Sequence, residues 1–295
     1  MAIIVDGRKI ASAILTDLKP RVETIKKQGG QAALAVIIVG DDKPSQTYVK
    51  KKGESAQEIG AGFFKFPFPG NIKKEDLIKE IRKIQSENQL SGLIIQLPLP
   101  EALRPFTREI VNQINQKIDV DCLTNESLGK VLMGTNNLVP PTPGAMLEIL
   151  KFHQIDLKGR SVVVIGKGNL IGRPLTALLL HQPVSLIVLG KECSDLSVYT
   201  KTADIIFTGV GKNGILNGTM VKNGAIVIDA GVSFVGKKMF GDIDFESVKE
   251  KASLVTPVPG GVGPITVAKL LENTVISAER LIVKLNSKSQ APNNK

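Results

Sequence analysis

The sequence predicts an α/β protein with two α/β domains flanking a cleft, the C-terminal one a Rossmann-like nucleotide-binding domain with a mainly parallel sheet. Three observations support this prediction. The chain has 295 residues, more than a single domain usually contains. Short β-like runs alternate with helical patterns from end to end, as in βαβ units. A proline-rich run at residues 139–144 interrupts the alternation and indicates a domain junction.

The elements of the first half follow from local patterns. In the segment from Lys74, the residues Leu77, Ile78, Ile81 and Ile84 fall on one helical face, a spacing that suits a helix packed on a sheet. The expected elements are helices at 11–27, 45–59 and 74–87 and strands at 34–39, 62–66 and 93–97.

The second half repeats the pattern with more strands. The expected strands are at 161–165, 184–189, 205–208 and 225–229, and the last helix spans about 264–284. This helix is long enough to return to the first domain. We therefore expect one domain from residues 1–141 plus 272–295, which binds substrate, and a Rossmann-like domain from residues 142–271.

Composition narrows the classes of function. The formal net charge of +10 suits a small polyanionic substrate, because the lysines are scattered and no nucleic-acid-binding module occurs. No run reaches the roughly 18 apolar residues of a membrane span. Cys122 and Cys193 are too few for a disulfide framework or, with His153 and His181, for a metal cage. We expect a cytoplasmic protein with no metal, no membrane and no specific nucleic-acid partner.

A glycine-rich turn follows the apolar run at residues 162–165 and precedes a helical pattern. Gly166, Lys167 and Gly168 open this turn, which would direct backbone N–H groups at a pyrophosphate. After the next strand, Lys191 favours the 2′-phosphate of NADP whereas Glu192 favours NAD. The sequence predicts NADP as cofactor, with NAD as the alternative.

Two further segments carry polar groups suited to catalysis. Tyr48 and Lys52 are four residues apart in a helical pattern, so they share one face, where an ammonium beside a phenol can move a proton. A solvated lysine patch is the simpler interpretation of that segment alone. Gln96 is the one amide in the apolar run at residues 92–100, and the Gly/Pro run at 257–264 allows close backbone approach to a flat ligand.

Through these segments the chain resembles the bifunctional methylenetetrahydrofolate dehydrogenase/methenyltetrahydrofolate cyclohydrolase family. The motifs at residues 119–121, 227–231 and 241–244 extend the resemblance over almost the whole chain. It implies that Lys52 transfers protons, Tyr48 orients the folate, Gln96 bonds near Lys52 and Asp121 holds the pterin. It also implies folate contacts by Gly260, Gly261 and Pro264, cofactor contacts by Gly166, Lys167, Gly168, Lys191 and Val232, and a homodimer.

The activity that the resemblance implies has two steps. NADP oxidises 5,10-methylenetetrahydrofolate to 5,10-methenyltetrahydrofolate, which is hydrolysed to 10-formyltetrahydrofolate in one-carbon metabolism. Polyglutamylated folates would suit the net positive charge. A cyclohydrolase with a weakened nucleotide site is the alternative, because Lys167-Gly168 and Gly190-Lys191 depart from the common Arg-Ser and His-Ser pairs. Cys122 also replaces a usual glycine.

Overall fold

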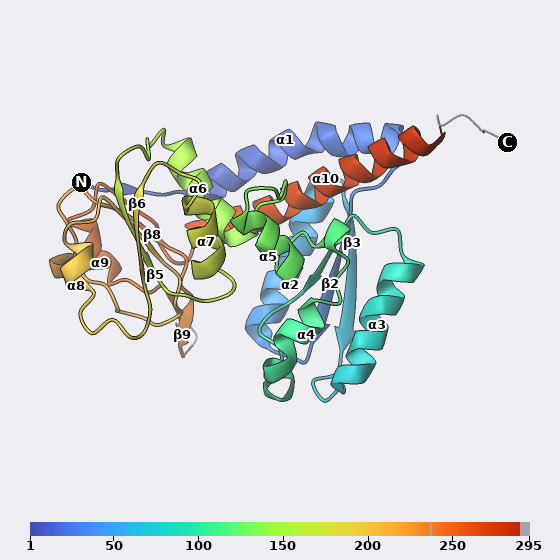
Figure 1. The fold of residues 1–295 in the computed structure, drawn as a ribbon, viewed down its shortest axis with the longest axis horizontal. Helices are drawn as coiled ribbons and strands as arrows, with labels where there is room; N and C mark the ends of the chain where they lie inside the picture. The colour runs from blue at the N-terminus through green and yellow to red at the C-terminus, as the bar shows by residue number, and fades with distance from the viewer. Residues whose placement is uncertain (237, 290–295) are drawn as a thin grey trace. The chain divides into compact units, whose positions relative to one another are not determined.

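The structure is a computed structural model that describes residues 1–236 and 238–289. Its contacts divide the chain into two compact units (Figure 1). One unit contains Met1–Ser12 and Gly129–Lys269, and the other contains Ala13–Leu128 and the chain from Leu270 onward. We call them the six-stranded unit and the three-stranded unit after their main sheets.

The three-stranded unit is built on a parallel sheet with the strand order β3-β2-β4. All residues of the central strand β2 are buried, as expected for a parallel strand covered on both faces. Its strands are β2 (Ala33–Val39), β3 (Gly62–Phe68) and β4 (Gly92–Ile95). The helices described in this unit include α2 (Lys43–Glu58), α3 (Lys74–Glu87), α4 (Thr107–Val111) and the 3₁₀ turns Glu101–Phe106 and Gln116–Ile118.

Helices cover both faces of this sheet. The core cluster that contains Ala35 and Ile37 of β2 also contains Leu77, Ile81 and Ile84 of α3, so the predicted apolar stripe of α3 packs on that face. Helix α2 packs on the opposite face (Figure 1), where a side chain at Gly53 would meet the ring of Phe63 at 3.0 Å. The lack of a side chain at Gly53 therefore allows α2 to pack closely on the sheet.

The six-stranded unit is built on a sheet in which every neighbouring pair of strands is parallel. The strand order is β1-β11-β8-β7-β5-β6, with a crossover between β5 and β7 that is typical of nucleotide-binding domains. The strands are β1 (Ile3–Ile4), β5 (Ser161–Ile165), β6 (Ser185–Leu189), β7 (Ile205–Thr208), β8 (Ile226–Asp229) and β11 (Leu254–Val255).

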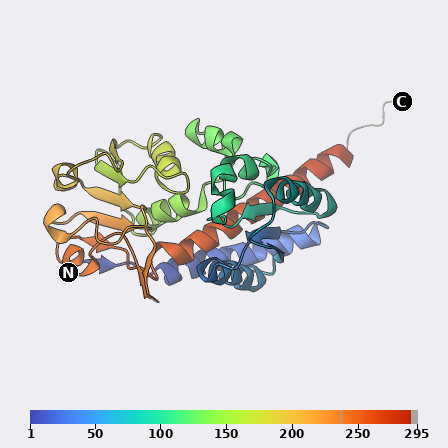
Figure 2. The ribbon, with the colours of Figure 1, turned by 90° about the horizontal axis from the view of Figure 1, so that it is seen from below.

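Short elements complete this unit. An antiparallel pair, β9 (Ser233–Val235) and β10 (Lys238–Phe240), follows β8. The helices are α5 (Asn125–Leu132), α6 (Pro141–Phe152), α7 (Gly172–Leu179), α8 (Ser197–Thr200) and α9 (Phe245–Lys249), with a 3₁₀ turn at Gly218–Met220. The division between the units falls within α5, and within the long helices α1 (Gly7–Lys27) and α10 (Val262–Ser289), which Figure 2 shows in blue and red.

The N-terminal residues differ from the expected domain assignment. The sequence predicts residues 1–141 in the substrate domain, but residues 1–12 and residues 129–141 belong to the six-stranded unit in the structure. For residues 1–12 the physical reason is that Ile3 and Ile4 of β1 pair in parallel with Leu254 and Val255 of β11. Residues 290–295, which the expected substrate domain includes, lie outside the described residues.

Candidate active site

Helix α2 presents Tyr48 and Lys52 on one side. The helix begins after Asp42, whose carboxylate accepts a hydrogen bond from the Ser45 backbone N–H at 2.8 Å and caps the first turn. Both Tyr48 and Lys52 are half-buried, whereas Lys51 between them is exposed. The predicted shared face is therefore present, and Lys52 is not part of a solvated lysine patch.

Gln96 follows the last residue of β4 and contacts Lys52. The Lys52 ammonium Nζ donates a hydrogen bond to the Gln96 side-chain oxygen Oε1 at 2.9 Å. The Gln96 amide nitrogen Nε2 donates in turn to the Leu97 carbonyl at 2.8 Å, and the Gln96 backbone N–H donates to Ile37 of β2. Because the amide nitrogen is already engaged, the amide oxygen faces the ammonium.

A tight turn after the 3₁₀ segment Gln116–Ile118 positions Asp121. The buried carboxylate of Asp119 accepts from the backbone N–H groups of Leu123, at 3.2 Å, and Thr124, at 2.9 Å. Within this turn Cys122 is buried and has a φ of 55°, in the left-handed region that favours glycine. Cys122 therefore holds a backbone conformation that glycine adopts more readily.

Burial shifts the pKa values of three side chains in this cluster, Lys52, Asp121 and Tyr48. Burial lowers the pKa of the Lys52 ammonium, and the negative charge of Asp121 partly offsets that effect. Burial raises the pKa of Asp121 to about 6, with the Lys52 charge opposing the rise and Asp119 adding to it. Burial also raises the pKa of the Tyr48 phenol. The cluster thus holds an amine and a carboxyl whose pKa values are closer to neutrality than usual, as proton transfer requires.

The Gly/Pro loop lies in the six-stranded unit. Gly260 has a φ of 109°, which only glycine adopts without strain, and its carbonyl accepts a hydrogen bond from the Gly7 N–H at 3.0 Å. Gly261 donates its N–H to the Pro257 carbonyl at 2.9 Å, and Pro264 lies in the first turn of α10. The loop is therefore bonded to the start of α1.

The glycine-rich turn has the geometry that a pyrophosphate requires. Gly166 follows β5 with a φ of 116°, and a side chain at Gly172, which begins α7, would meet the Gly166 carbonyl oxygen at 1.9 Å. Only glycines allow the turn and the helix start to approach so closely. The Arg173 backbone N–H in the first turn of α7 donates to the Gly168 carbonyl at 3.0 Å, so the positive end of the helix lies against the turn.

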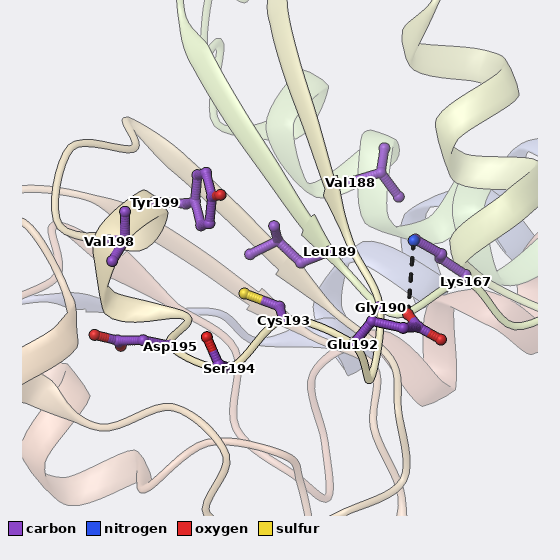
Figure 3. Close-up of a pocket in the computed structure, with 10 residues that line it drawn as sticks. All are labelled: Lys167, Val188, Leu189, Gly190, Glu192, Cys193, Ser194, Asp195, Val198 and Tyr199. Atoms are coloured by element: carbon purple, nitrogen blue, oxygen red, sulfur yellow. Dashed lines mark ion pairs between the residues drawn. The ribbon is translucent and has the colours of Figure 1, made fainter.

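A pocket lies beside this turn, between Lys167 and the segment at residues 188–199 (Figure 3). The Lys167 ammonium forms an ion pair with Glu192 at 3.8 Å, and both side chains are more than half exposed. Lys191, predicted from sequence to contact the cofactor, is exposed and is not among the lining residues of this pocket. Gly168 is also exposed.

Two buried aspartates, to which the sequence assigned no role, organise the turns that follow β7 and β8. The Asp242 carboxylate accepts from the Thr208 hydroxyl at 2.6 Å and from the backbone N–H groups of Val210, Gly211 and Lys212 at 2.6–2.9 Å. Asp229 accepts from the N–H groups of Gly231, Asp242 and Ile243. Val232, a predicted cofactor contact, follows the second turn and is 39% exposed.

The two aspartates also fill space beside two glycines. A side chain at Gly231 would lie 2.0 Å from Asp242, and one at Gly241 would lie 2.0 Å from Asp229. The motifs at residues 227–231 and 241–244 therefore interlock. The signal in the sequence was an acid within two residues of a glycine in each motif, but the pairing of the two motifs depends on contacts between residues far apart in the chain.

No group of three or more His, Cys, Asp or Glu residues suited to holding a metal ion occurs among the described residues. Within the same part of the chain, no helix combines the length and apolar character that crossing a bilayer would need.

Comparison with known proteins covers almost the whole chain. Residues 5–121 match the family model of the tetrahydrofolate dehydrogenase/cyclohydrolase catalytic domain, and residues 140–282 match that of its NAD(P)-binding domain. The Bifunctional protein FolD of Nautilia profundicola is 41% identical over 277 residues, which are 94% of this chain and 97% of that protein.

Solved structures give the same relationship. The FolD methylenetetrahydrofolate dehydrogenase/cyclohydrolase of Campylobacter jejuni superposes with a TM-score of 0.91 at 37% identity, covering 95% of this chain and 100% of its own. The FolD of Trypanosoma brucei, solved with NADP and an inhibitor, also has a TM-score of 0.91, at 32% identity over 95% of this chain and 98% of its own. This chain belongs to the tetrahydrofolate dehydrogenase/cyclohydrolase family.

Proposed function

We propose that this chain oxidises 5,10-methylenetetrahydrofolate to 5,10-methenyltetrahydrofolate with NADP and then hydrolyses that product to 10-formyltetrahydrofolate. The observation that carries the proposal is the half-buried Lys52 ammonium, hydrogen-bonded to Gln96 and influenced by the charge of Asp121. Family membership supplies the reaction class, and this cluster supplies groups suited to its acid–base step.

Each residue of the cluster has a separate role. Lys52 transfers the proton when water adds to the methenyl carbon and the ring opens. Gln96 orients the ammonium, because its amide is itself held by the Leu97 carbonyl. Asp121 holds the polar edge of the pterin and keeps the pKa of Lys52 from falling further. Tyr48 packs against the folate and orients it. Gly260, Gly261 and Pro264 complete the folate site.

The residues of the six-stranded unit fit a dinucleotide. The close packing of Gly172 on Gly166 and the start of α7 directly after the glycine-rich turn suit a pyrophosphate, and the pocket beside Lys167 suits the adenosine end. NAD(P), when bound, supplies the acceptor for the hydride that leaves the one-carbon bridge. Gly166, Lys167 and Gly168 would hold the phosphates, Lys191 the 2′-phosphate region and Val232 the nicotinamide end.

Further parts of the proposal concern organisation and partners. We assign residues 1–141 plus 272–295 to folate binding and residues 142–271 to NAD(P) binding, with two exceptions: residues 1–12, which add β1 to the six-stranded sheet, and residues 129–141, which belong to the six-stranded unit. We also propose a cytoplasmic homodimer that accepts polyglutamylated folates. The low cysteine content and the net charge of +10 support the compartment and the substrate form, respectively.

The test measures both steps with purified protein. Methylenetetrahydrofolate with NADP or NAD should yield the absorbance of the methenyl product and the reduced nucleotide, and no turnover with either nucleotide would remove the proposal. Lys52→Met should abolish hydrolysis of supplied methenyltetrahydrofolate. Lys51→Met, a matched change at the exposed neighbouring lysine, should leave it intact.

The cyclohydrolase-only alternative is not favoured, because residues 140–282 match the NAD(P)-binding domain of the family. It requires hydrolysis of the methenyl compound without any binding of NAD or NADP in a calorimeter, so the same protein sample distinguishes the two functions.

A further inference from the structure

The pocket beside the glycine-rich turn contains an ion pair at the place where Rossmann domains read the adenosine ribose. The strand β6 ends at Leu189, and the residues directly after it distinguish a ribose hydroxyl from a 2′-phosphate in this fold. Glu192 lies in that segment, and its carboxylate oxygen Oε2 is 3.8 Å from the Lys167 ammonium (Figure 3).

Gly190 lets both side chains occupy the same place. A side chain at Gly190 would meet Glu192 Oε2 at 2.3 Å and the Lys167 carbons Cδ and Cε at 3.0 Å. The side chains of Lys167 and Glu192 therefore lie over the Gly190 backbone, in the space that a larger residue would take. The absence of a side chain at Gly190 is what leaves this space.

The charges of the pocket are unusual for a site that binds a 2′-phosphate. Its lining contains one cation, Lys167, and two acids, Glu192 and Asp195. Asp195 is engaged in the fold, because it accepts the Ser197 backbone N–H at 2.8 Å at the start of α8. Glu192 is the acid paired with the cation, and its side chain is 67% exposed, so it lies within reach of a ligand.

We propose that Glu192 is a specificity-determining residue that competes with the 2′-phosphate of NADP for Lys167, an inference that rests on the proposed NAD(P) binding. The ribose hydroxyl of NAD donates a hydrogen bond to a carboxylate, whereas a phosphate is repelled by it and must displace it from the ammonium. Because an exposed ion pair is weak, the phosphate can still bind. The chain therefore accepts both nucleotides with little discrimination.

The experiment is calorimetric binding of NADP and of NAD, without folate, to the natural protein and to Glu192→Gln. The glutamine keeps an acceptor oxygen for the ribose hydroxyl but removes the charge. We expect the ratio of the NADP Kd to the NAD Kd to fall roughly fivefold, mainly through tighter NADP binding. Glu250→Gln, which removes an equal charge at an exposed site outside the pocket, should leave the ratio unchanged.

A second variant tests the route through Lys167. In a Lys167→Met background, the added change Glu192→Gln should alter the ratio less than it does in the natural protein. An equal effect in both backgrounds, or an unchanged ratio in Glu192→Gln, overturns this inference and leaves the proposed function standing. Failure to bind either nucleotide would instead remove both. Thermal unfolding of each variant verifies that the protein is folded.

Discussion

Two neighbours of Lys52 both favour the protonated form of its ammonium. The Gln96 oxygen accepts a hydrogen bond from the ammonium, and the Asp121 carboxylate attracts it, so both favour the protonated form against the effect of burial. The spacing of Tyr48 and Lys52 was enough to predict a shared helix face. The bond to Gln96 joins residues 44 positions apart and could not be read from the local pattern.

The pH profile of the hydrolysis step should report this balance. Asp121→Asn removes a negative charge that raises the pKa of Lys52, so the limb of the profile that titrates with Lys52 should move to lower pH. Gln96→Glu adds a negative charge at the position that now accepts from Nζ and should move the same limb to higher pH. Movement in the same direction for both variants would contradict the electrostatic origin.

At the scale of secondary-structure elements, the turns after β7 and β8 depend on buried carboxylates. Asp242 is fully buried and accepts from one hydroxyl and three backbone N–H groups. The strands themselves were predictable, because runs such as residues 161–165 and 205–208 are apolar and short. Strand β1, with two residues, was not, since it forms only by pairing with β11 far along the chain.

Removing one of these carboxylates should destabilise the fold. Asp242→Ala removes the acceptor of one buried hydroxyl and of three part-buried backbone N–H groups, and we expect a loss of roughly 1–3 kcal/mol in the free energy of unfolding. Asp244→Ala is the matched control, because Asp244 is exposed and precedes α9 without a side-chain capping bond. Urea unfolding of both variants gives the comparison, and equal losses would contradict the role of Asp242.

The second carboxylate should make stability depend on pH. Burial, together with the charge of Asp242, raises the pKa of Asp229 to about 7, although three backbone N–H groups act in the opposite direction. Its folded-state pKa lies above the value in the unfolded chain, so the folded state binds the proton more tightly. The stability that Asp229 contributes should therefore be largest below about pH 4 and decline as pH rises to about 7.

The measurement is the difference in unfolding free energy between the natural protein and Asp229→Asn across that pH range. The asparagine does not titrate, so the difference isolates the carboxyl, and the natural protein should lose stability relative to the variant as pH rises. A difference independent of pH would show that the carboxyl keeps its ordinary pKa.

At the scale of the whole molecule, alternating strands and helices and the proline-rich run at residues 139–144 predicted the fold class well. The apolar stripe of α3 was enough to predict that this helix packs on the sheet. The assignment of residues 1–12 could not be predicted in this way, because it depends on the pairing of β1 with β11 far along the chain. The net charge of +10 is a sum over all 295 residues rather than a feature of any local pattern.

That charge should favour substrates with long polyglutamate tails. We expect a pentaglutamate form of methylenetetrahydrofolate to have a lower KM than the monoglutamate at low salt, with the gap shrinking as salt is added, because screening weakens long-range attraction. The measurement is the KM of each substrate form by steady-state kinetics at two ionic strengths. A gap that is insensitive to salt would assign the preference to direct contacts instead.

The interlocked turns at residues 227–231 and 241–244 have a consequence for how this protein can change over time. Each glycine leaves room for the aspartate of the other turn. A mutation at Gly231 would displace Asp242, which holds the turn after β7, and a mutation at Gly241 would displace Asp229, which holds the backbone at Asp242 and Ile243. Neither turn can diverge by single steps. We expect a library randomised at one of them to return the starting residues, and variants to survive only when both turns are exchanged together from a homologue.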